Sequence, residues 1–336
     1  MNNSNSSSEL GNGFGRVIGI GSYLPENILT NDDLAKIVET NDQWITERTG
    51  IKTRHISDPE KDTTESMAIA AAQAAVKDAG IDPMEIGLIV VASTTPNILF
   101  PALAACVQAA VDADHAMCFD LNAACPGFIT AYVTAQNYIR SGMVSCALVV
   151  GAENLSNYTN YEDRGTCILF GDGAGAVVLK ADPDLQYDAI MRAAGKRSGC
   201  LRCESVMQKG KEKTPEFIKS NYINMDGQTV FKFAVTEVPK VVDDILAKTG
   251  TSADEIDYFI LHQANRRIIE SVAKHLKQPI EKFPMNIEKT GNTSSASIPI
   301  LLNEMKKDGR LGEGKKKVVI SSFGAGLIWG AFQTEM

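Results

Sequence analysis

An approximate internal repeat is the feature that most constrains how this chain can fold. The segment AGIDPMEIGLIVVAS (residues 79–93) resembles TGTSADEIDYFILHQ (residues 249–263), and its glycine, glutamate and isoleucine recur at a constant spacing of 170 positions. Two further pairs match in the same order, residues 149–150 with 318–319 and residues 170–178 with 322–330. One such match could arise between any two helix–loop–strand units. Three in the same order favour a duplicated chain with two similar halves.

Short apolar runs alternate with helical segments along the chain. Strands are expected at residues 16–20, 87–92, 147–151 and 318–322, and a helix at residues 66–79 with Gly80 as its C-terminal cap. This alternation predicts an α/β architecture whose sheets are covered on both faces. We place the boundary near residue 185, which gives an N-terminal half (residues 14–185) and a C-terminal half (residues 186–336).

Composition argues against several classes of protein. The 33 Lys and Arg against 41 Asp and Glu give a net charge of −8, which disfavours a nucleic-acid partner. No apolar run approaches the 18 residues of a membrane span. Residues 1–13 are rich in Asn and Ser and lack the pattern of a signal peptide, so we expect a disordered tail. Seven scattered cysteines favour a reducing cytoplasm over a disulfide framework.

Cys125 is the first candidate for chemistry. It lies between an expected strand end at residues 120–124 and a nearly uncharged helix expected over residues 127–141, with Pro126 suited to the first helical turn. A cysteine at a helix N-terminus can act as a nucleophile, because the helix dipole lowers the pKa of its thiol. The alternative is a buried structural cysteine, which is the more frequent role of free cysteine.

Two polar residues of the C-terminal half are further candidates. His262 follows four apolar residues and is expected at the end of a buried strand, where active sites of α/β proteins collect. Asn292 lies in a turn of small polar residues that leads into a helix through Ser297. Taken alone, His262 could equally be a structural histidine and Asn292 a turn or cap residue.

Three other motifs do not indicate a nucleotide or a metal. The glycine-rich segments at residues 170–179 and 321–332 lack the lysine of a phosphate loop and the spacing of a dinucleotide-binding motif, but their N–H groups could hold a thioester oxyanion. Cys200 and Cys203 form a CxxC without a second ligand pair or a thioredoxin-like context. We therefore expect no metal site.

Taken together, the motifs resemble the 3-oxoacyl-[acyl-carrier-protein] synthase III family of the thiolase superfamily. The resemblance runs from about residue 15 to the C-terminus and rests on WITERTGI (44–51), NAACPGF (122–128), DRGTCILFGDGAGA (163–176), HQANRRI (262–268), GNTSSASIP (291–299) and SFGAGLIWG (322–330). It implies a thiolase-like five-layer αβαβα fold of two duplicated halves, each with a mixed five-stranded sheet. It also implies a catalytic triad of Cys125, His262 and Asn292.

The family chemistry then maps onto these residues. The resemblance implies that Cys125 attacks the thioester of an acyl-CoA, with its own N–H and that of Ala325 as the oxyanion hole. It also implies that malonyl-acyl carrier protein then loses CO2 and attacks the acyl-cysteine. His262 and Asn292 would hold the enolate oxygen. No cofactor or metal is implied, because the coenzyme A thioester is a substrate and hydrogen bonds can hold both developing charges. The implied enzyme is the initiating acyltransferase of fatty-acid biosynthesis, a cytoplasmic homodimer.

Further residues carry over from the family with defined roles. The CoA-binding positions are Thr40, Trp44, Arg48, Arg164, Gln228 and Phe231; Gln228 stands where the family often has asparagine. Phe100 matches a residue that closes the acyl pocket across a dimer interface, which favours a short primer such as acetyl. Lys232, Arg267 and Lys274 are the positions expected to dock the acidic carrier protein, although each could be an ordinary solvated charge.

Two alternatives keep the same fold. The protein could be a related acyltransferase of secondary metabolism that uses another acceptor. It could also be a non-catalytic homologue, although such homologues usually lose the nucleophile. The motifs alone do not distinguish fatty-acid synthesis from secondary metabolism, and they do not define the length or branching of the primer.

Overall fold

The computed structural model describes residues 13–204, 221–312 and 314–336. All but the last residue of the predicted tail (1–13) lie outside the described residues. The first described element, β1, begins at Phe14.

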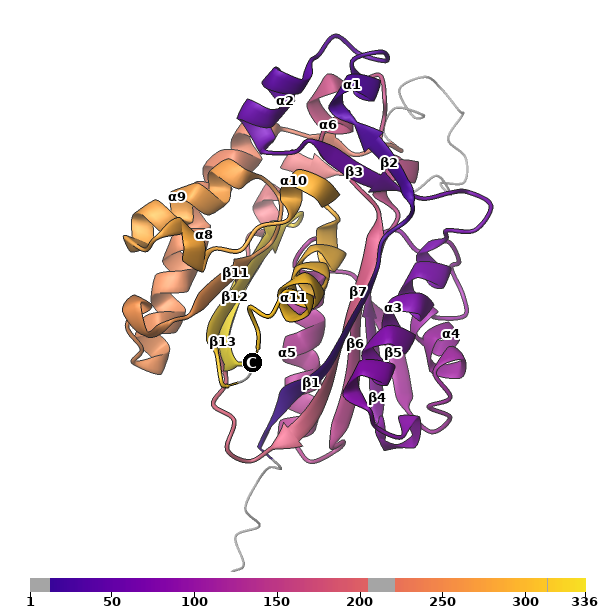
Figure 1. The fold of residues 1–336 in the computed structure, drawn as a ribbon, viewed down its shortest axis with the longest axis vertical. Helices are drawn as coiled ribbons and strands as arrows, with labels where there is room; N and C mark the ends of the chain where they lie inside the picture. The colour runs from indigo at the N-terminus through magenta and orange to yellow at the C-terminus, as the bar shows by residue number, and fades with distance from the viewer. Residues whose placement is uncertain (1–12, 205–220, 313) are drawn as a thin grey trace, which may run out of the picture.

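Two sheets form the framework of the molecule (Figure 1). The N-terminal sheet has the order β1-β7-β6-β4-β5, with bounds Phe14–Tyr23 (β1), Gly173–Asp182 (β7), Cys146–Glu153 (β6), Leu88–Ala92 (β4) and Met117–Leu121 (β5). The C-terminal sheet has the order β11-β12-β13-β8, with bounds Tyr258–Leu261 (β11), Lys317–Gly324 (β12), Ile328–Glu335 (β13) and Asp188–Ala193 (β8). β4 runs parallel to β6 as β11 does to β12, and β7 and β13 each have two antiparallel neighbours. The shared topology confirms the duplication.

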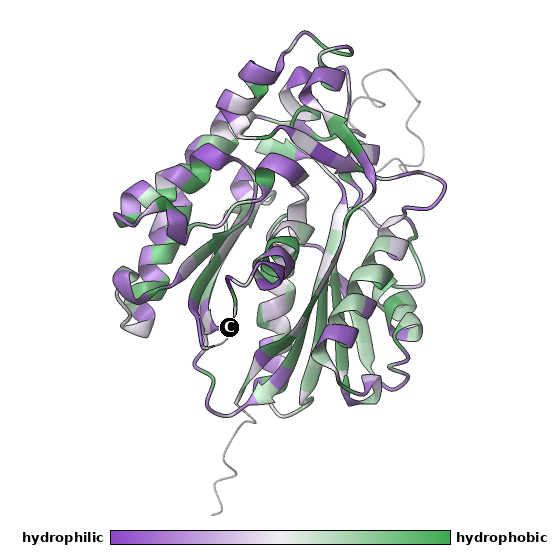
Figure 2. Ribbon diagram, in the orientation of Figure 1, coloured by the Kyte–Doolittle hydropathy of each residue, from purple (hydrophilic) through white to green (hydrophobic). Residues whose placement is uncertain are grey.

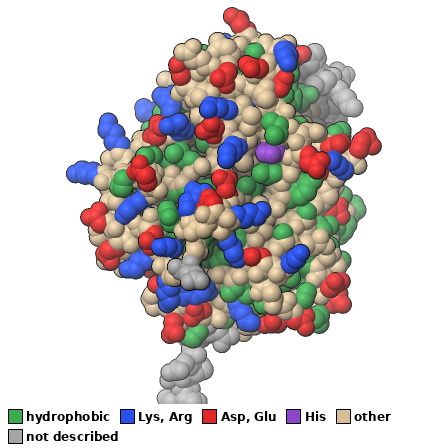
Figure 3. Space-filling view, in the orientation of Figure 1, with side chains coloured by type: hydrophobic (Ala, Val, Ile, Leu, Met, Phe, Trp, Pro, Cys, Tyr) green, Lys and Arg blue, Asp and Glu red, His purple; other side chains and the backbone are tan. Residues whose placement is uncertain are grey.

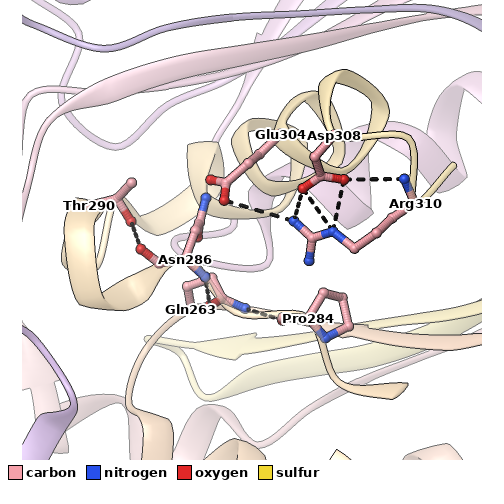
Figure 4. Close-up of polar contacts among 7 residues, drawn as sticks. All are labelled: Gln263, Pro284, Asn286, Thr290, Glu304, Asp308 and Arg310. Carbon is pink, nitrogen blue, oxygen red and sulfur yellow. Dashed lines mark hydrogen bonds and ion pairs between the residues drawn. The ribbon is translucent and has the colours of Figure 1, made fainter. Parts of the chain in front are cut away.

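The C-terminal sheet differs from the prediction because it has four strands in the described part of the chain, not five. By analogy with β5, the missing strand would lie beside β11, where residues 284–286 run. Pro284 has no backbone N–H to offer a strand partner. The side chain of Gln263 bridges the gap instead: Nε2 donates to the carbonyls of Leu261 (2.7 Å) and Pro284 (3.5 Å), and Oε1 accepts from the N–H of Asn286 (3.1 Å; Figure 4).

Helices cover both faces of each sheet and complete the predicted five-layer fold. The outer layers are α3 (Thr64–Ala79) and α4 (Leu103–Ala110) on one side and α8 (Gly227–Thr249) and α9 (Arg266–Leu276) on the other, with α5 (Gly127–Arg140) and α11 (Ser297–Lys307) between the sheets. The alternating side chains of β4 show that the sheet is covered on both faces. Leu88 and Val90 pack in the core between the two sheets, whereas Ile89 and Val91 pack against the outer helices. A strand buried on both faces is apolar throughout. Green predominates along the central strands of the two large sheets in Figure 2.

Short elements complete the chain. They are α1 (Asn31–Leu34), α2 (Asp42–Thr49), α6 (Arg164–Cys167), α10 (Ile287–Thr290), β2 (Asn27–Thr30), β3 (Thr53–Ile56), β9 (Leu201–Arg202), β10 (Asn224–Met225) and the 3-10 turns η1 (Pro83–Glu85), η2 (Leu155–Tyr158), η3 (Gly195–Cys200), η4 (Ala253–Glu255), η5 (Ile280–Lys282) and η6 (Ser294–Ala296). Gly80 caps α3 in the left-handed conformation (φ 62°), as predicted. Among the described residues, no helix is long and apolar enough to cross a membrane.

Candidate active site

One cavity of about 1180 Å³ receives residues from both halves of the chain. Cys125, His262 and Asn292, which lie far apart in the sequence, all line it. Each lies just after the end of an element: Cys125 comes four residues after β5, His262 directly follows the buried strand β11, and Asn292 follows α10. The duplicated fold therefore brings these three side chains to one place.

The backbone turns sharply at Cys125. Ala124, the preceding residue, has a φ of 52°, and its carbonyl accepts from the N–H of Gly127 at 2.7 Å. Such left-handed conformations of non-glycine residues are costly and cluster at functional sites. Gly324, the last residue of β12, packs against this turn: a Cβ at this position would lie 2.9 Å from both the Cβ and the N of Cys125. Only glycine allows the backbone before Ala325 to come this close to the thiol.

The predicted lowering of the Cys125 pKa is wrong. Burial raises the pKa of the thiol to about 11, and the nearby charge of Glu153 also raises it. Although part of the side chain is accessible from the cavity, protein surrounds the sulfur and removes the water that would stabilise a thiolate. Cys125 also precedes the N-cap of the helix, Pro126, and so lies just outside the first turn.

His262 is buried and neutral. Its Nδ1 lies 2.7 Å from the hydroxyl of Ser297, the first residue of α11, and its ring meets Phe323 edge-on with centroids 5.7 Å apart. Burial lowers its pKa to about 3. A neutral imidazole carries one proton, so a hydroxyl that donates to Nδ1 leaves the N–H on Nε2.

Asn292 is held at both its backbone and its side chain. Its N–H donates to the carbonyl of Leu169 (2.8 Å), and its own carbonyl accepts from the N–H of Gly171 (3.1 Å). The amide oxygen accepts from the N–H of Ser294 at 2.8 Å. Because the oxygen is engaged in this turn, the NH2 group is the part of the amide left to act on a ligand. The turn role and a donor role are therefore compatible.

Three of the predicted CoA-binding residues, Trp44, Arg48 and Arg164, lie against one another. The guanidinium groups of Arg48 and Arg164 lie over the ring of Trp44, 4.7 and 4.8 Å from its centroid. Arg164 also donates to the carbonyl of Glu39 (3.0 Å). No base fits between Trp44 and Arg164 at this separation, so Arg164 must move if a base is to stack there. Arg48 lines the cavity, and Thr40 has a buried hydroxyl without a hydrogen-bond partner.

The remaining predicted residues divide between the cavity and the surface. Gln228, Phe231, Arg267 and Ala325 line the cavity, and the guanidinium of Arg267 lies 5.0 Å from the centroid of Phe231. Outside it, Lys232 borders a second, smaller pocket together with Lys196 and Arg197, and Lys274 is exposed on α9. Phe100 is 85% exposed, while the neighbouring Leu99 lines the cavity.

Several residues of the site were not identified from the sequence. Ser297 and Ser294 stand within the quoted GNTSSASIP motif, where serines suggest only turns and caps. Glu153, at the end of β6, accepts hydrogen bonds from both halves of the chain, and no local pattern marks it. Gln263 follows His262 directly and reads from the sequence as an ordinary polar residue.

The CxxC and the glycine-rich segments have ordinary structural places. Cys200 and Cys203 are free, and the sulfur of Cys203 contacts the carbonyl of Asn221 at 3.1 Å. The glycine-rich segments lead into β7 and join β12 to β13. The described part of the chain contains no cluster of three or more His, Cys, Asp or Glu that could hold a metal ion.

Comparison with known proteins gives a consistent family. Residues 119–196 match the model for 3-oxoacyl-[acyl-carrier-protein] synthase III, and residues 246–336 match that for its C-terminal part. The beta-ketoacyl-[acyl-carrier-protein] synthase III of Clostridium acetobutylicum is 45% identical over 316 residues, which cover 94% of this chain and 96% of the relative.

Solved structures agree in fold. The 3-oxoacyl-[acyl-carrier-protein] synthase III of Aquifex aeolicus superposes with a TM-score of 0.88 at 42% identity, covering 96% of this chain and all of the other. A priming beta-ketosynthase of the R1128 polyketide pathway gives a TM-score of 0.90 at 32% identity, covering 97% of each chain. Together with the duplicated five-layer fold, these matches establish that the chain belongs to the 3-oxoacyl-[acyl-carrier-protein] synthase III family.

Proposed function

We propose that this protein is the initiating condensing enzyme of fatty-acid synthesis. It joins a short acyl-CoA, with acetyl-CoA as the first candidate, to malonyl-acyl carrier protein and releases CoA, CO2 and 3-ketoacyl-carrier protein. The observation that carries the proposal is the meeting of Cys125, His262 and Asn292 on one cavity in a member of this family. The CoA thioester enters as a substrate, and the proposal needs no other cofactor.

In the first half-reaction, Cys125 is the nucleophile. Its sulfur attacks the thioester carbonyl, the thiol proton leaves with CoA, and the acyl group stays on the enzyme. The N–H groups of Cys125 and Ala325 are the proposed oxyanion hole. The contact of Gly324 with the Cys125 backbone supports this pairing, because it puts the two N–H groups on neighbouring segments. The raised pKa of Cys125 means that its proton must be removed during attack rather than beforehand.

In the second half-reaction, His262 and Asn292 stabilise the enolate left by loss of CO2. A histidine with a pKa of about 3 cannot act as a standing cation near neutral pH, so it works as a neutral N–H donor. When the Ser297 hydroxyl donates to Nδ1, that donor is at Nε2, and the engaged oxygen of Asn292 favours its NH2 group as the second donor. The carbanion then attacks acyl-Cys125, and the thiol is regenerated.

The adenine and phosphate groups of CoA need an aromatic ring and positive charges, and both lie in or beside the cavity. We assign Trp44, with Arg164 displaced, to the adenine. We assign Arg48, which lines the cavity and contacts Trp44, to a phosphate, because a forked guanidinium suits a phosphate group. Thr40, Gln228 and Phe231 complete the proposed CoA site. Lys232, Arg267 and Lys274 form the proposed docking surface for the acidic carrier protein. On the face drawn in Figure 3, Lys and Arg side chains are interspersed with acidic ones, so docking depends on local patches.

We also propose a cytoplasmic homodimer. β5 is an edge strand of the N-terminal sheet and is only partly buried, and unpaired edges favour pairing with a second copy. The exposed Phe100 would be covered in such a dimer and would limit the acyl pocket to short primers. The seven free cysteines are consistent with a reducing compartment.

A second function deserves a direct test. The R1128 relative is described as a priming ketosynthase of a polyketide pathway, so an acyltransferase with another acceptor would share this fold. The two functions differ in what discharges the acyl-enzyme, and the presence of all three triad residues weighs against a non-catalytic homologue.

The test is intact-protein mass spectrometry with a panel of acyl-CoAs, before and after adding malonyl-carrier protein. The proposal expects one acyl group on the wild-type protein, none on Cys125→Ser, and discharge as 3-ketoacyl-carrier protein. Acylation without discharge to the carrier supports the second function. A folded wild-type protein that no CoA ester acylates refutes both.

A further inference from the structure

Arg54 is a fully buried arginine that the proposed mechanism does not use. It lies in β3, opposite Leu29 of β2. Nη1 donates to the carbonyl of Leu29 (3.2 Å) and to Oδ1 of Asn31 (2.9 Å), and Nη2 donates to the carbonyl of Ile168 (2.7 Å). Within the described structure its hydrogen-bond partners are therefore two carbonyls and an amide, and three separate elements meet at one guanidinium.

A charge buried in this way has a demanding geometry. Removing an ion from water is costly, and burial lowers the pKa of Arg54 to about 10, which still leaves it charged near neutral pH. Because no carboxylate is among its partners, well-placed oxygens must stabilise the charge. A planar fork of donors in fixed directions can meet several acceptors at once, which the single ammonium of a lysine does less well. Arg54 thus suits a place where several segments are held in a fixed relation.

The first of these partners leads to α2. Asn31 is 1% exposed and is the first residue of α1. Its Nδ2 donates to Oδ1 of Asp42 (2.9 Å), the first residue of α2, and to the carbonyl of Ile51 (2.8 Å), just past the end of α2. Asn31 therefore holds both ends of the helix that carries Trp44.

The second partner leads to α6. Ile168 is the C-cap of α6, the short helix that begins with Arg164. The guanidinium of Arg164 lies 4.8 Å from the centroid of the Trp44 ring. In Figure 1, α1, α2, α6, β2 and β3 gather at one end of the molecule. Arg54 therefore links the two helices whose side chains face each other in the proposed adenine site.

The chain after α6 continues to a residue of the proposed triad. The carbonyl of Leu169 accepts from the N–H of Asn292 (2.8 Å), and the N–H of Gly171 donates to the carbonyl of Asn292 (3.1 Å). The stem of Arg54 packs against both segments, since a Cβ on Gly171 or Gly291 would lie 3.2 or 3.1 Å from its Cβ. One side chain thus supports the adenine site and the backbone of the enolate donor.

We propose that Arg54 is a positioning residue, which holds α2 and α6 at a fixed separation and anchors the segment bonded to Asn292. The inference rests on the proposed function for its catalytic consequence. Because α6 is anchored at Ile168, a base enters by moving the side chain of Arg164 away from Trp44 while the helix stays in place. Loss of the guanidinium frees both helices and weakens binding of the nucleotide.

The first test is hydrogen exchange followed by mass spectrometry on wild type and Arg54→Lys. Lysine keeps the charge and loses the fork. We expect exchange in α2 and in residues 164–171 to accelerate at least about tenfold more than exchange in α3 and α8, because the lost bonds release these segments locally. An equal acceleration in all of them would show only a general loss of stability and would overturn the inference.

Arg16→Lys is the matched control. Arg16 is also a partly buried arginine with two side-chain acceptors, Asp182 and Glu335, but it does not line the cavity. This variant should leave exchange in α2 and in residues 164–171 within about twofold of wild type.

A second variant separates the two branches. Asn31→Ala breaks the branch to α2 alone, so it should loosen α2 and leave residues 164–171 as in wild type. If Arg54→Lys does not fold, this variant decides, because unchanged exchange in α2 would overturn the inference.

The catalytic consequence is measured with two acyl donors. In Arg54→Lys the acetyl-CoA concentration for half-maximal acylation of Cys125 should rise about tenfold, and that of acetyl-pantetheine, which lacks the nucleotide, by less than about twofold. Equal rises for both donors would refute a role at the adenine site. CO2 release from malonyl-carrier protein should fall several-fold in Arg54→Lys and not in Asn31→Ala, because only the first loosens the segment beside Asn292.

The two layers of the argument fail in different ways. A wild-type protein that does not accept acetyl-CoA would refute the proposed function. Hydrogen exchange needs no substrate and would still decide whether Arg54 holds α2 and α6 together.

Discussion

Replacing Ser297 by alanine removes the hydrogen bond that orients His262. The two side chains are 2% and 3% exposed and lie 2.7 Å apart, so no water replaces the lost hydroxyl. A buried polar atom left without a partner costs about 1–3 kcal/mol. At the lower end of the slope for larger domains, about 2 °C per kcal/mol, the melting temperature should fall by roughly 2–6 °C.

The catalytic effect should be larger than this modest destabilisation suggests. Without Ser297 the proton of the neutral imidazole is free to move to Nδ1, which leaves no donor at Nε2. If the hydrogen bond with Ser297 favours the Nε2-protonated form of His262 by about 1.4 kcal/mol, its loss slows decarboxylation of malonyl-carrier protein about tenfold. Because the pKa of His262 is about 3, this loss should not vary between pH 6 and 8.

The assay compares CO2 release with acyl-CoA consumption in wild type, Ser297→Ala and Ser297→Thr. Threonine retains the hydroxyl and should restore most of the rate. Ser321→Ala controls for loss of a buried hydroxyl, since among the described residues that group donates to the carbonyl of Gly330 (2.8 Å) and not to His262. A Ser297→Ala enzyme whose kcat lies within twofold of wild type would refute the orienting role.

Three further predictions concern stability, CoA binding and docking. The pKa of His262 is about 3 in the folded protein, below the roughly 6.5 of an unfolded histidine. Neutral His262 therefore contributes stability that is fully present above about pH 6.5 and is lost as the pH falls towards about 3. The free energy of unfolding should fall by up to about 1.4 kcal/mol per pH unit in this range. Urea denaturation at pH 7 and pH 5 should therefore show the difference between wild type and His262→Gln changing with pH; parallel losses would contradict this. Trp44→Ala should raise the KM for acyl-CoA about tenfold through lost stacking, with a smaller change in kcat, in steady-state kinetics. Lys274→Glu should raise the KM for malonyl-carrier protein about three- to tenfold at low salt and less at high salt, while acylation by acyl-CoA stays unchanged; a salt-independent effect would argue against docking there.

Much of the architecture follows from local sequence. The repeat predicts duplication because each copy encodes the same order of helix, turn and strand, as Gly80 and Gly250 show by ending α3 and α8 in the same left-handed conformation. Continuous apolar runs such as β4 predict strands buried on both faces. The motifs also located Cys125 and His262 at the ends of elements, because a change from apolar to polar residues is visible along the chain.

The tertiary structure decided what depends on contacts between distant segments. Burial raises the pKa of Cys125, and the distant residues that bury it cannot be identified from its neighbours in the sequence. The four-stranded C-terminal sheet reflects a bridge by Gln263 that no strand pattern announces. Glu153 reads from the sequence as one more acid at a strand end. Only the packing of the two halves adds the hydroxyls of Ser294 and Ser295 to its donors, because hydrogen bonds between residues more than 140 positions apart depend on the folded chain.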